Sequence, residues 1–184
     1  MSEGKDTLRI ITYGHPTLRA RCAPVTEFNP ELRELAQAMH RTMVAADGVG
    51  LAASQVDQRV RLFVVGVPQR DSDELTRMTL VNPEILEQRG EWEYEEGCLS
   101  IPDVRDDVTR PEWIKLRYQD LDGKPHTIEA TGLLGRVFQH ELDHLNGVLF
   151  IDHLSPLKRA LHGGKLRKLI RENEQELAGG AERK

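Results

Sequence analysis

The segment RVFQHELDHLNG, residues 136–147, constrains the fold most, because its apolar residues recur with the period of an amphipathic helix. One broad arc of the helical wheel holds Leu133, Leu134, Val137, Phe138, Leu142 and Leu145. The opposite, polar arc holds Arg136, Gln139, Asp143 and Asn146. His140 and His144 lie at the edge of the apolar arc, about 6 Å apart along the helix axis. Glu141 falls near the middle of the apolar arc, where a solvated helix would not place a carboxylate.

Burying an unpaired charge is costly, so Glu141 needs a strong local partner, either a cation or a proton exchanged during chemistry. Two histidines four residues apart can direct imidazole nitrogens at one metal ion, and a glutamate after the first can reach water on that ion. The HExxH pattern therefore favours a metal site. The alternative is a pair of core histidines hydrogen-bonded to backbone carbonyls. Asp143 is interpreted as a surface or supporting carboxylate rather than a ligand.

A catalytic metal site commonly has three protein ligands and one open position, so a third ligand must come from elsewhere in the chain. The candidates are Cys98, the other histidines and many carboxylates. Cys98 follows Gly97 in EEGCLSIP, where the glycine allows close approach of the backbone. A thiolate suits a borderline-soft metal such as Zn or Fe(II). Taken alone, a cysteine is more often a small buried hydrophobe, so the third ligand stays open at this point.

The remaining chain predicts an α+β fold with antiparallel or mixed β-sheets packed around the central HExxH-bearing helix, flanked by an N-terminal and a C-terminal helix. Extended segments are expected at 60–67, 79–88 and 91–100, and a hairpin at 113–130 with Asp122-Gly123 in its turn. Helices are expected from Asn29 to Gly48, from Gly132 to about Asn146 between Thr131 and Gly147, and from Ser155-Pro156, weakened at Gly163-Gly164. We expect one domain over residues 1–184, with 170–184 as a frayed tail.

Composition narrows the functional class. The 184 residues carry a net charge of −5, which argues against DNA or general nucleic-acid binding. No apolar run reaches membrane-spanning length, and the N-terminus has no signal-peptide core, so a cytoplasmic location is expected. Cys22 and Cys98 are the only cysteines, so no disulfide framework is implied.

Three stretches resemble, in order and spacing, the signature motifs of peptide deformylases: GVGLAASQV at 48–56, EGCLS at 96–100 and QHELDH at 139–144. VNP at 81–83, RP at 110–111 and LSPLKR at 154–159 are also similar to that family. The resemblance covers roughly residues 7–160. Ser54 stands where the family usually has proline, and as a loop position it is expected to affect the chemistry little.

The resemblance implies hydrolytic removal of the formyl group from the N-terminal formyl-methionine of newly synthesised polypeptides. By the matching motif positions, Cys98, His140 and His144 bind one divalent metal ion. Glu141 is the general base and acid, while Gln55 and the backbone N–H of Leu99 polarise the formyl oxygen. The family's natural ion is Fe(II), although Zn, Ni or Co can occupy the site.

The helical stripe and the resemblance together predict a substrate pocket. Leu133 and Val137 share the stripe of the two histidines, so with Val49 they are expected to hold the methionine side chain. The alternative is that they are ordinary core residues. Gly50 is expected to leave backbone open for the peptide to pair as an added strand. By resemblance, Glu96 and Arg110 form a buried pair that supports the site; the alternative is a surface ion pair.

The C-terminal segment suggests a partner. Residues 155–171 hold six basic and no acidic side chains: Lys158, Arg159, Lys165, Arg167, Lys168 and Arg171. In related proteins the C-terminal helix docks on the ribosome, so ribosome association is implied. The alternative is a solvated basic face.

Two other functions compete with deformylation. A zinc peptidase would use the same HExxH residues to bind and activate the metal ion, with a later His or Glu as third ligand. A non-enzymatic binding module would keep the fold without the chemistry. The presence of Gln55, Cys98, His140, Glu141 and His144 argues against the second.

Overall fold

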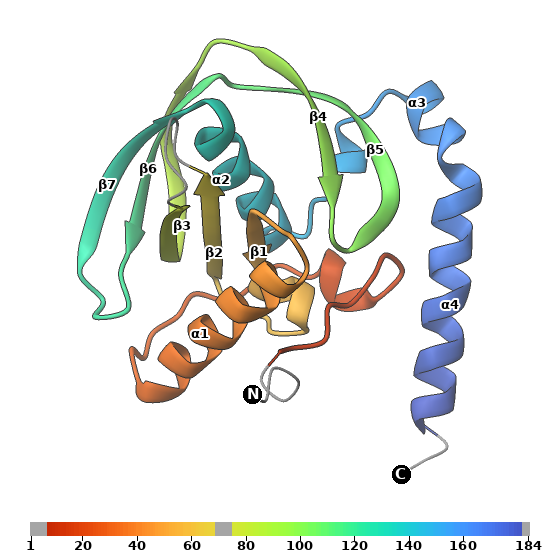
Figure 1. The fold of residues 1–184 in the computed structure, drawn as a ribbon, viewed down its shortest axis with the longest axis horizontal. Helices are drawn as coiled ribbons and strands as arrows, with labels where there is room; N and C mark the ends of the chain where they lie inside the picture. The colour runs from red at the N-terminus through yellow and green to blue at the C-terminus, as the bar shows by residue number, and fades with distance from the viewer. Residues whose placement is uncertain (1–6, 69–74, 182–184) are drawn as a thin grey trace.

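The protein is described by a computed structural model that covers residues 7–68 and 75–181, with side chains up to residue 178. Figure 1 shows the order and arrangement of the elements. The helices are η1 (Pro16–Arg19), α1 (Pro30–Ala45), η2 (Ala53–Val56), α2 (Gly132–Leu145), η3 (Phe150–Asp152), α3 (Pro156–Leu161) and α4 (Gly163–Ala181). The strands are β1 (Gly50–Ala52), β2 (Leu62–Pro68), β3 (Leu75–Arg89), β4 (Trp92–Cys98), β5 (Ile101–Arg110), β6 (Trp113–Gln119) and β7 (Pro125–Thr131).

The strands form a five-stranded sheet in the order β1-β2-β3-β6-β7 and a separate two-stranded sheet, β4-β5. All pairs between these strands are antiparallel. The β6–β7 hairpin turns through Gly123, whose φ of +78° only glycine adopts readily, as the Asp122-Gly123 pair predicts. Together with the helices, this arrangement confirms the predicted α+β class.

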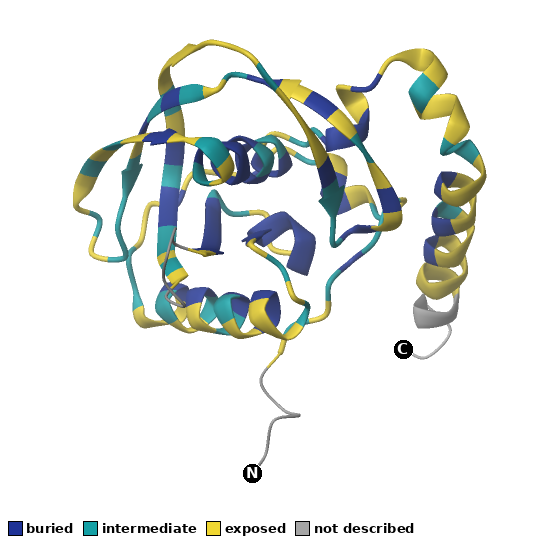
Figure 2. Ribbon diagram, turned by 45° about the horizontal axis from the view of Figure 1, so that its top comes forward, coloured by how far each residue is buried: buried dark blue, intermediate teal, exposed yellow. Residues whose placement is uncertain are grey.

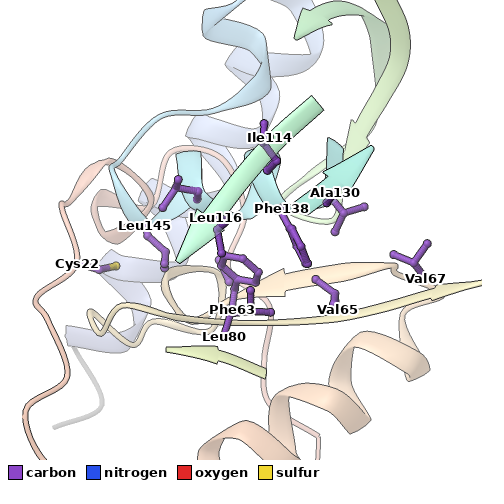
Figure 3. Close-up of a cluster of buried hydrophobic side chains, with 13 residues drawn as sticks. Cys22, Phe63, Val65, Val67, Leu80, Ile114, Leu116, Ala130, Phe138 and Leu145 are labelled. Atoms are coloured by element: carbon purple, nitrogen blue, oxygen red, sulfur yellow. The ribbon is translucent and has the colours of Figure 1, made fainter. Parts of the chain in front are cut away.

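Helices α1 and α2 cover opposite faces of the five-stranded sheet, and the side chains of β2 contact the clusters on both faces. Successive side chains of a strand point to opposite faces. Phe63 and Val65 therefore join the cluster on the α2 side, while Leu62 and Val64 join the cluster on the α1 side. Figure 3 shows the α2-side cluster, in which the rings of Phe63 and Phe138 lie 6.0 Å apart. Because β2 is buried on both faces, its sequence is a continuous run of apolar residues and does not alternate with polar ones.

The β4–β5 hairpin arches beside α2 and carries Cys98 at the end of β4 (Figure 1). Leu99 and Ser100 form the turn, because Cys98 pairs directly with Ile101. The preceding pair is Gly97 with Arg105, so residues 102–104 bulge from β5, and Asp103 adopts a left-handed φ of 62°. Such a bulge bends its strand and re-aims nearby side chains. The apolar side of β5 packs on η3 and α4.

Helix α4 lies along one side of the molecule, beyond β5 (Figure 1), with buried residues on one side only (Figure 2). Leu166, Leu169 and Asn173 are buried there, and the Asn173 amide donates to the Thr12 hydroxyl at 2.7 Å and the Tyr13 carbonyl at 3.0 Å. The expected last helix begins at Pro156 with Ser155 as its cap, but it breaks at His162, directly before the glycine pair. No helix in the described part of the chain is long and apolar enough to cross a membrane.

The helix boundaries differ slightly from the expectations. Helix α1 begins at Pro30 with Asn29 Oδ1 accepting from Leu32 N, as predicted, but it ends at Ala45. Asp47, not Gly48, takes the left-handed conformation after it. Helix α4 is described to Ala181, and residues 182–184 lie outside the described part; the frayed tail and the single domain therefore stay predictions.

Candidate metal centre

Cys98, His140 and His144 converge where the end of β4 meets α2. One ligand atom from each residue lies within 4.8 Å of the others. Cys98 Sγ lies 3.2 Å from His144 Nε2. The two imidazoles come from successive turns of α2, with ring centres 5.0 Å apart. The three residues therefore form a group that could hold a metal ion.

Glu96 orients His140. Its carboxylate lies 2.9 Å from His140 Nδ1, so Nδ1–H donates to it and Nε2 is left to face the cysteine. Arg110 donates twice to the same carboxylate, at 2.6 and 3.0 Å, and Arg136 donates once, at 2.7 Å. Burial alone would raise the pKa of Glu96, but the hydrogen bonds from His140 and Arg110 outweigh it and hold the pKa far below its usual range. The expected Glu96–Arg110 pair is thus buried rather than on the surface.

The histidines respond differently to their surroundings. Burial lowers the pKa of His144 well below its usual value. Burial also disfavours charge on His140, but hydrogen bonds with Cys98 and Glu96 raise its pKa. A neutral imidazole is the form that binds a metal. The hydrogen bonds with Cys98 and Glu96 therefore affect how readily His140 gives up its proton.

Asp143 supports the site from the side of η3. Its carboxylate accepts from Arg110 at 2.8 Å and lies 2.7 Å from His153 Nε2. It is not within the group of possible ligand atoms. The interpretation of Asp143 as a supporting carboxylate rather than a ligand fits this position.

Glu141 is buried beside the group, with its side chain against β1. A Cβ at Gly50 would overlap Glu141 Oε1 and would lie 2.8 Å from Val137 Cγ1, so only glycine leaves room there. Glu141 Oε2 has no hydrogen-bond partner among the described residues. Burial raises the pKa of Glu141 to about 7. The carboxyl can therefore gain and lose a proton near neutral pH.

Gln55 and Leu99 lie close to Cys98. Gln55 Oε1 accepts from Ala52 N at 2.9 Å, which fixes the amide and turns its NH₂ toward Ser100 Oγ at 3.2 Å and Cys98 Sγ at 3.6 Å. Leu99 follows the cysteine in the hairpin turn. Both residues line the cavity described next.

A cavity of about 600 Å³ opens onto Cys98, His140 and Glu141. The four predicted substrate-binding residues all line it: Val49, Gly50, Leu133 and Val137. His144 lies behind its wall and is almost fully buried. A second cavity, of about 640 Å³, lies near Trp92 and the start of α2, but none of the three ligand residues lines it. The first cavity is therefore the candidate active site.

The sequence interpretation misjudged three residues. Arg136 and its neighbour Gln139 were placed on a polar arc, yet both are buried. Arg136 lies four residues before His140, and this spacing is the signal that places it on the histidine stripe. Ser54, expected to be a loop position of little effect, is fully buried in η2 and donates to the His144 carbonyl at 3.2 Å.

Comparisons with known proteins agree with this geometry. The family model of polypeptide deformylase matches residues 7–160. A peptide deformylase of Wolinella succinogenes is 47% identical over 163 residues, which cover 88% of this chain and 96% of that protein. A crystal structure of a peptide deformylase from Legionella pneumophila has a TM-score of 0.82 and 41% identity, covering 91% of this chain and 98% of that one. The resemblance seen in the sequence is confirmed: the chain is an enzyme that belongs to the polypeptide deformylase family.

Proposed function

We propose that this enzyme hydrolyses the N-terminal formamide of formyl-methionine on newly synthesised polypeptides, releasing formate and a free amine, and that it needs a divalent metal ion. The observation that carries the proposal is the convergence of Cys98, His140 and His144 within 4.8 Å, next to a buried carboxyl with an unpaired oxygen. Family membership supports the same reaction.

The three ligand residues fit a divalent ion. A thiolate with two imidazoles suits Fe(II) or Zn, and three protein ligands leave one position open, as in other catalytic sites. The hydrogen bond from His140 to Glu96 is the kind of support that metal-binding histidines usually have. We propose Fe(II) as the natural ion, with Zn, Ni or Co able to replace it. When bound, the ion lowers the pKa of a water molecule and makes a nucleophile available near neutral pH.

The protein's own groups then carry the proton and the developing charge. Glu141, whose pKa is about 7, takes a proton from the attacking water and passes it to the leaving amine as the C–N bond breaks. Gln55 Nε2–H and the backbone N–H of Leu99 donate to the formyl oxygen as it becomes an oxyanion. Loss of one such donor typically costs about 3 kcal/mol of transition-state stabilisation.

The cavity walls hold the first residue of the substrate. Leu133, Val137 and Val49 offer apolar surface beside the ligand group, and a flexible thioether side chain fits such a wall. Gly50 begins β1, an edge strand of the five-stranded sheet, so it is placed to let the peptide backbone pair with the sheet.

The isosteric variant Glu141→Gln tests the mechanism. We expect formate release from a formyl-Met-Ala-Ser peptide, measured anaerobically with iron-loaded enzyme, to fall by about 10²–10⁴-fold, because the variant cannot accept a proton. Glu174→Gln, an exposed position on α4, is the matched control and should keep full activity. Absence of formate release by freshly prepared iron-loaded wild type would contradict the proposal.

A cytoplasmic location stays a prediction, and we further propose that the enzyme associates with the ribosome through α4. Four of the six basic residues contact acceptors within the chain: Lys158 binds Asp106, Arg159 lies near Asp152, Lys165 donates to the Asp103 carbonyl, and Lys168 lies near Glu172. Arg167 and Arg171 are exposed on α4. Arg167→Ala/Arg171→Ala should therefore reduce co-sedimentation with ribosomes at low salt, and unchanged co-sedimentation would count against docking through α4.

A further inference from the structure

We propose that Arg136 reads the tip of the substrate's first side chain by donating its Nε–H to an acceptor there, so that the pocket takes methionine sulfoxide as well as methionine. This inference rests on the proposed deformylation and concerns the specificity of the same cavity. Arg136 lines that cavity together with Leu133 and Val137, yet only 3% of its surface is exposed.

The position of Arg136 matches the length of the substrate side chain. Arg136 precedes His140 by four residues on α2, which places it about 6 Å further along the helix axis from the ligand group. Val137 provides apolar wall between the two ends, and Leu133 lines the cavity on the turn beyond Arg136. A methionine side chain that starts beside His140 and follows this wall therefore ends near the guanidinium.

The Nε atom of the Arg136 guanidinium has no hydrogen-bond partner among the described residues. Arg136 Nη1 donates to Glu96 Oε1 at 2.7 Å and to the Val108 carbonyl at 3.0 Å, and Nη2 donates to the Trp92 carbonyl. Among the residues that the structure describes, none accepts from the buried Nε. A buried donor without a partner is destabilising, so a ligand that brings an acceptor to it gains affinity.

The charge around Arg136 favours a neutral acceptor. The guanidinium charge of Arg136 is already paired with the Glu96 carboxylate, and Arg110 is paired with Glu96 and Asp143 in the same network. The rings of Trp92 and Tyr94 lie 4.7 and 5.7 Å from the guanidinium carbon and restrict its movement. A thioether sulfur is a weak acceptor, whereas a sulfoxide oxygen is a strong and neutral one.

Three formylated tripeptides test this inference, with methionine, methionine sulfoxide or norleucine as first residue. The measured quantity is the ratio of kcat/KM for the sulfoxide to kcat/KM for norleucine. We expect Arg136→Leu and Arg136→Lys to lower this ratio by about tenfold or more, the value of one hydrogen bond to a charged donor. Damage to the fold affects both peptides equally and cancels in the ratio. A change of less than about twofold would overturn the inference.

A spectroscopic measurement gives an independent readout. The Nε–H signal of Arg136 in a ¹H–¹⁵N spectrum is identified by its loss in Arg136→Lys. It should shift when the deformylated sulfoxide peptide binds and stay in place when the norleucine peptide binds; the same shift with both would overturn the inference. If wild type released formate from none of the peptides, the proposed deformylation would be contradicted. The spectrum would still show whether Arg136 Nε–H binds the sulfoxide.

Discussion

Glu96 and Asp106 stand opposite each other in the β4–β5 hairpin, and each binds cations from a different helix. Glu96 is buried and binds Arg110, Arg136 and His140, which ties the hairpin to α2. Asp106 is near the surface and binds Lys158 and His162 at 2.8 and 2.9 Å, which ties the hairpin to α3 and the start of α4. Like charges facing each other across a strand pair repel, and each carboxylate here has its own counter-charges.

The difference between these two clusters lies in what happens when one member is removed. Around Glu96, water cannot replace a lost partner, so the remaining cations would stay buried and unpaired. Around Asp106, water and salt ions can replace it. The first cluster therefore holds the candidate metal-binding residues in place. The second cluster joins two surface elements and contributes little to the free energy of unfolding.

The largest expected effect is that of Glu96→Gln. It leaves Arg110 and Arg136 buried with one carboxylate fewer, so we expect a loss of roughly 3–5 kcal/mol in the free energy of unfolding, measured in urea. It should also weaken metal binding by about 10–100-fold, because His140 loses its acceptor. Glu95→Gln, at an exposed neighbour that pairs loosely with Arg105 at 3.6 Å, is the control. Equal losses in the two variants would show that the buried partners of Glu96 contribute no more than an exposed ion pair.

Asp106→Asn should have a much smaller effect, of about 1 kcal/mol or less in the free energy of unfolding at neutral pH. Because its partners lie near the surface, adding 1 M salt should reduce this loss further, while the loss in Glu96→Gln should persist. A salt-insensitive loss of several kcal/mol in Asp106→Asn would show that the outer cluster behaves like the inner one.

The smallest expected effect is the pH dependence of the outer cluster. Hydrogen bonds from Lys158 and His162 lower the pKa of Asp106 to about 2. An unfolded aspartate titrates near pH 4, so the stabilisation by Asp106 is fully present above about pH 4 and is lost as the pH falls through 2. The difference in urea stability between wild type and Asp106→Asn should therefore shrink between pH 5 and pH 2. A difference that grows on acidification would contradict this assignment.

Much of the central helix could be predicted from its sequence. The helical period places Glu141 among apolar residues, and the structure finds it buried with an unpaired oxygen. The same period brings His140 and His144 together. The third member of the group could not be derived in this way, because the position of Cys98 depends on the pairing of β4 with β5 and on the bulge at 102–104. Only the resemblance singled it out.

The wheel misplaced Arg136 because it sorts residues by polarity, whereas a guanidinium can be buried when carboxylates and carbonyls surround it. Those acceptors, Glu96 and the Trp92 and Val108 carbonyls, come from another part of the chain and leave no local signal. Ser54 was misjudged for a similar reason, since its acceptor is the distant His144 carbonyl. Long-range partners decide both positions.

The short turn at Leu99 and Ser100 and the bulge at 102–104 also limit which insertions and deletions the β4–β5 hairpin can accept during evolution. Side chains alternate between the two faces of a strand, so deletion of a single residue between 101 and 105 would exchange inside for outside along the rest of β5. Substitutions on the outer face of the hairpin can accumulate freely, but changes in its length would move the thiol away from the imidazoles. We therefore expect lineages of this enzyme to vary here in composition and to stay fixed in residue count.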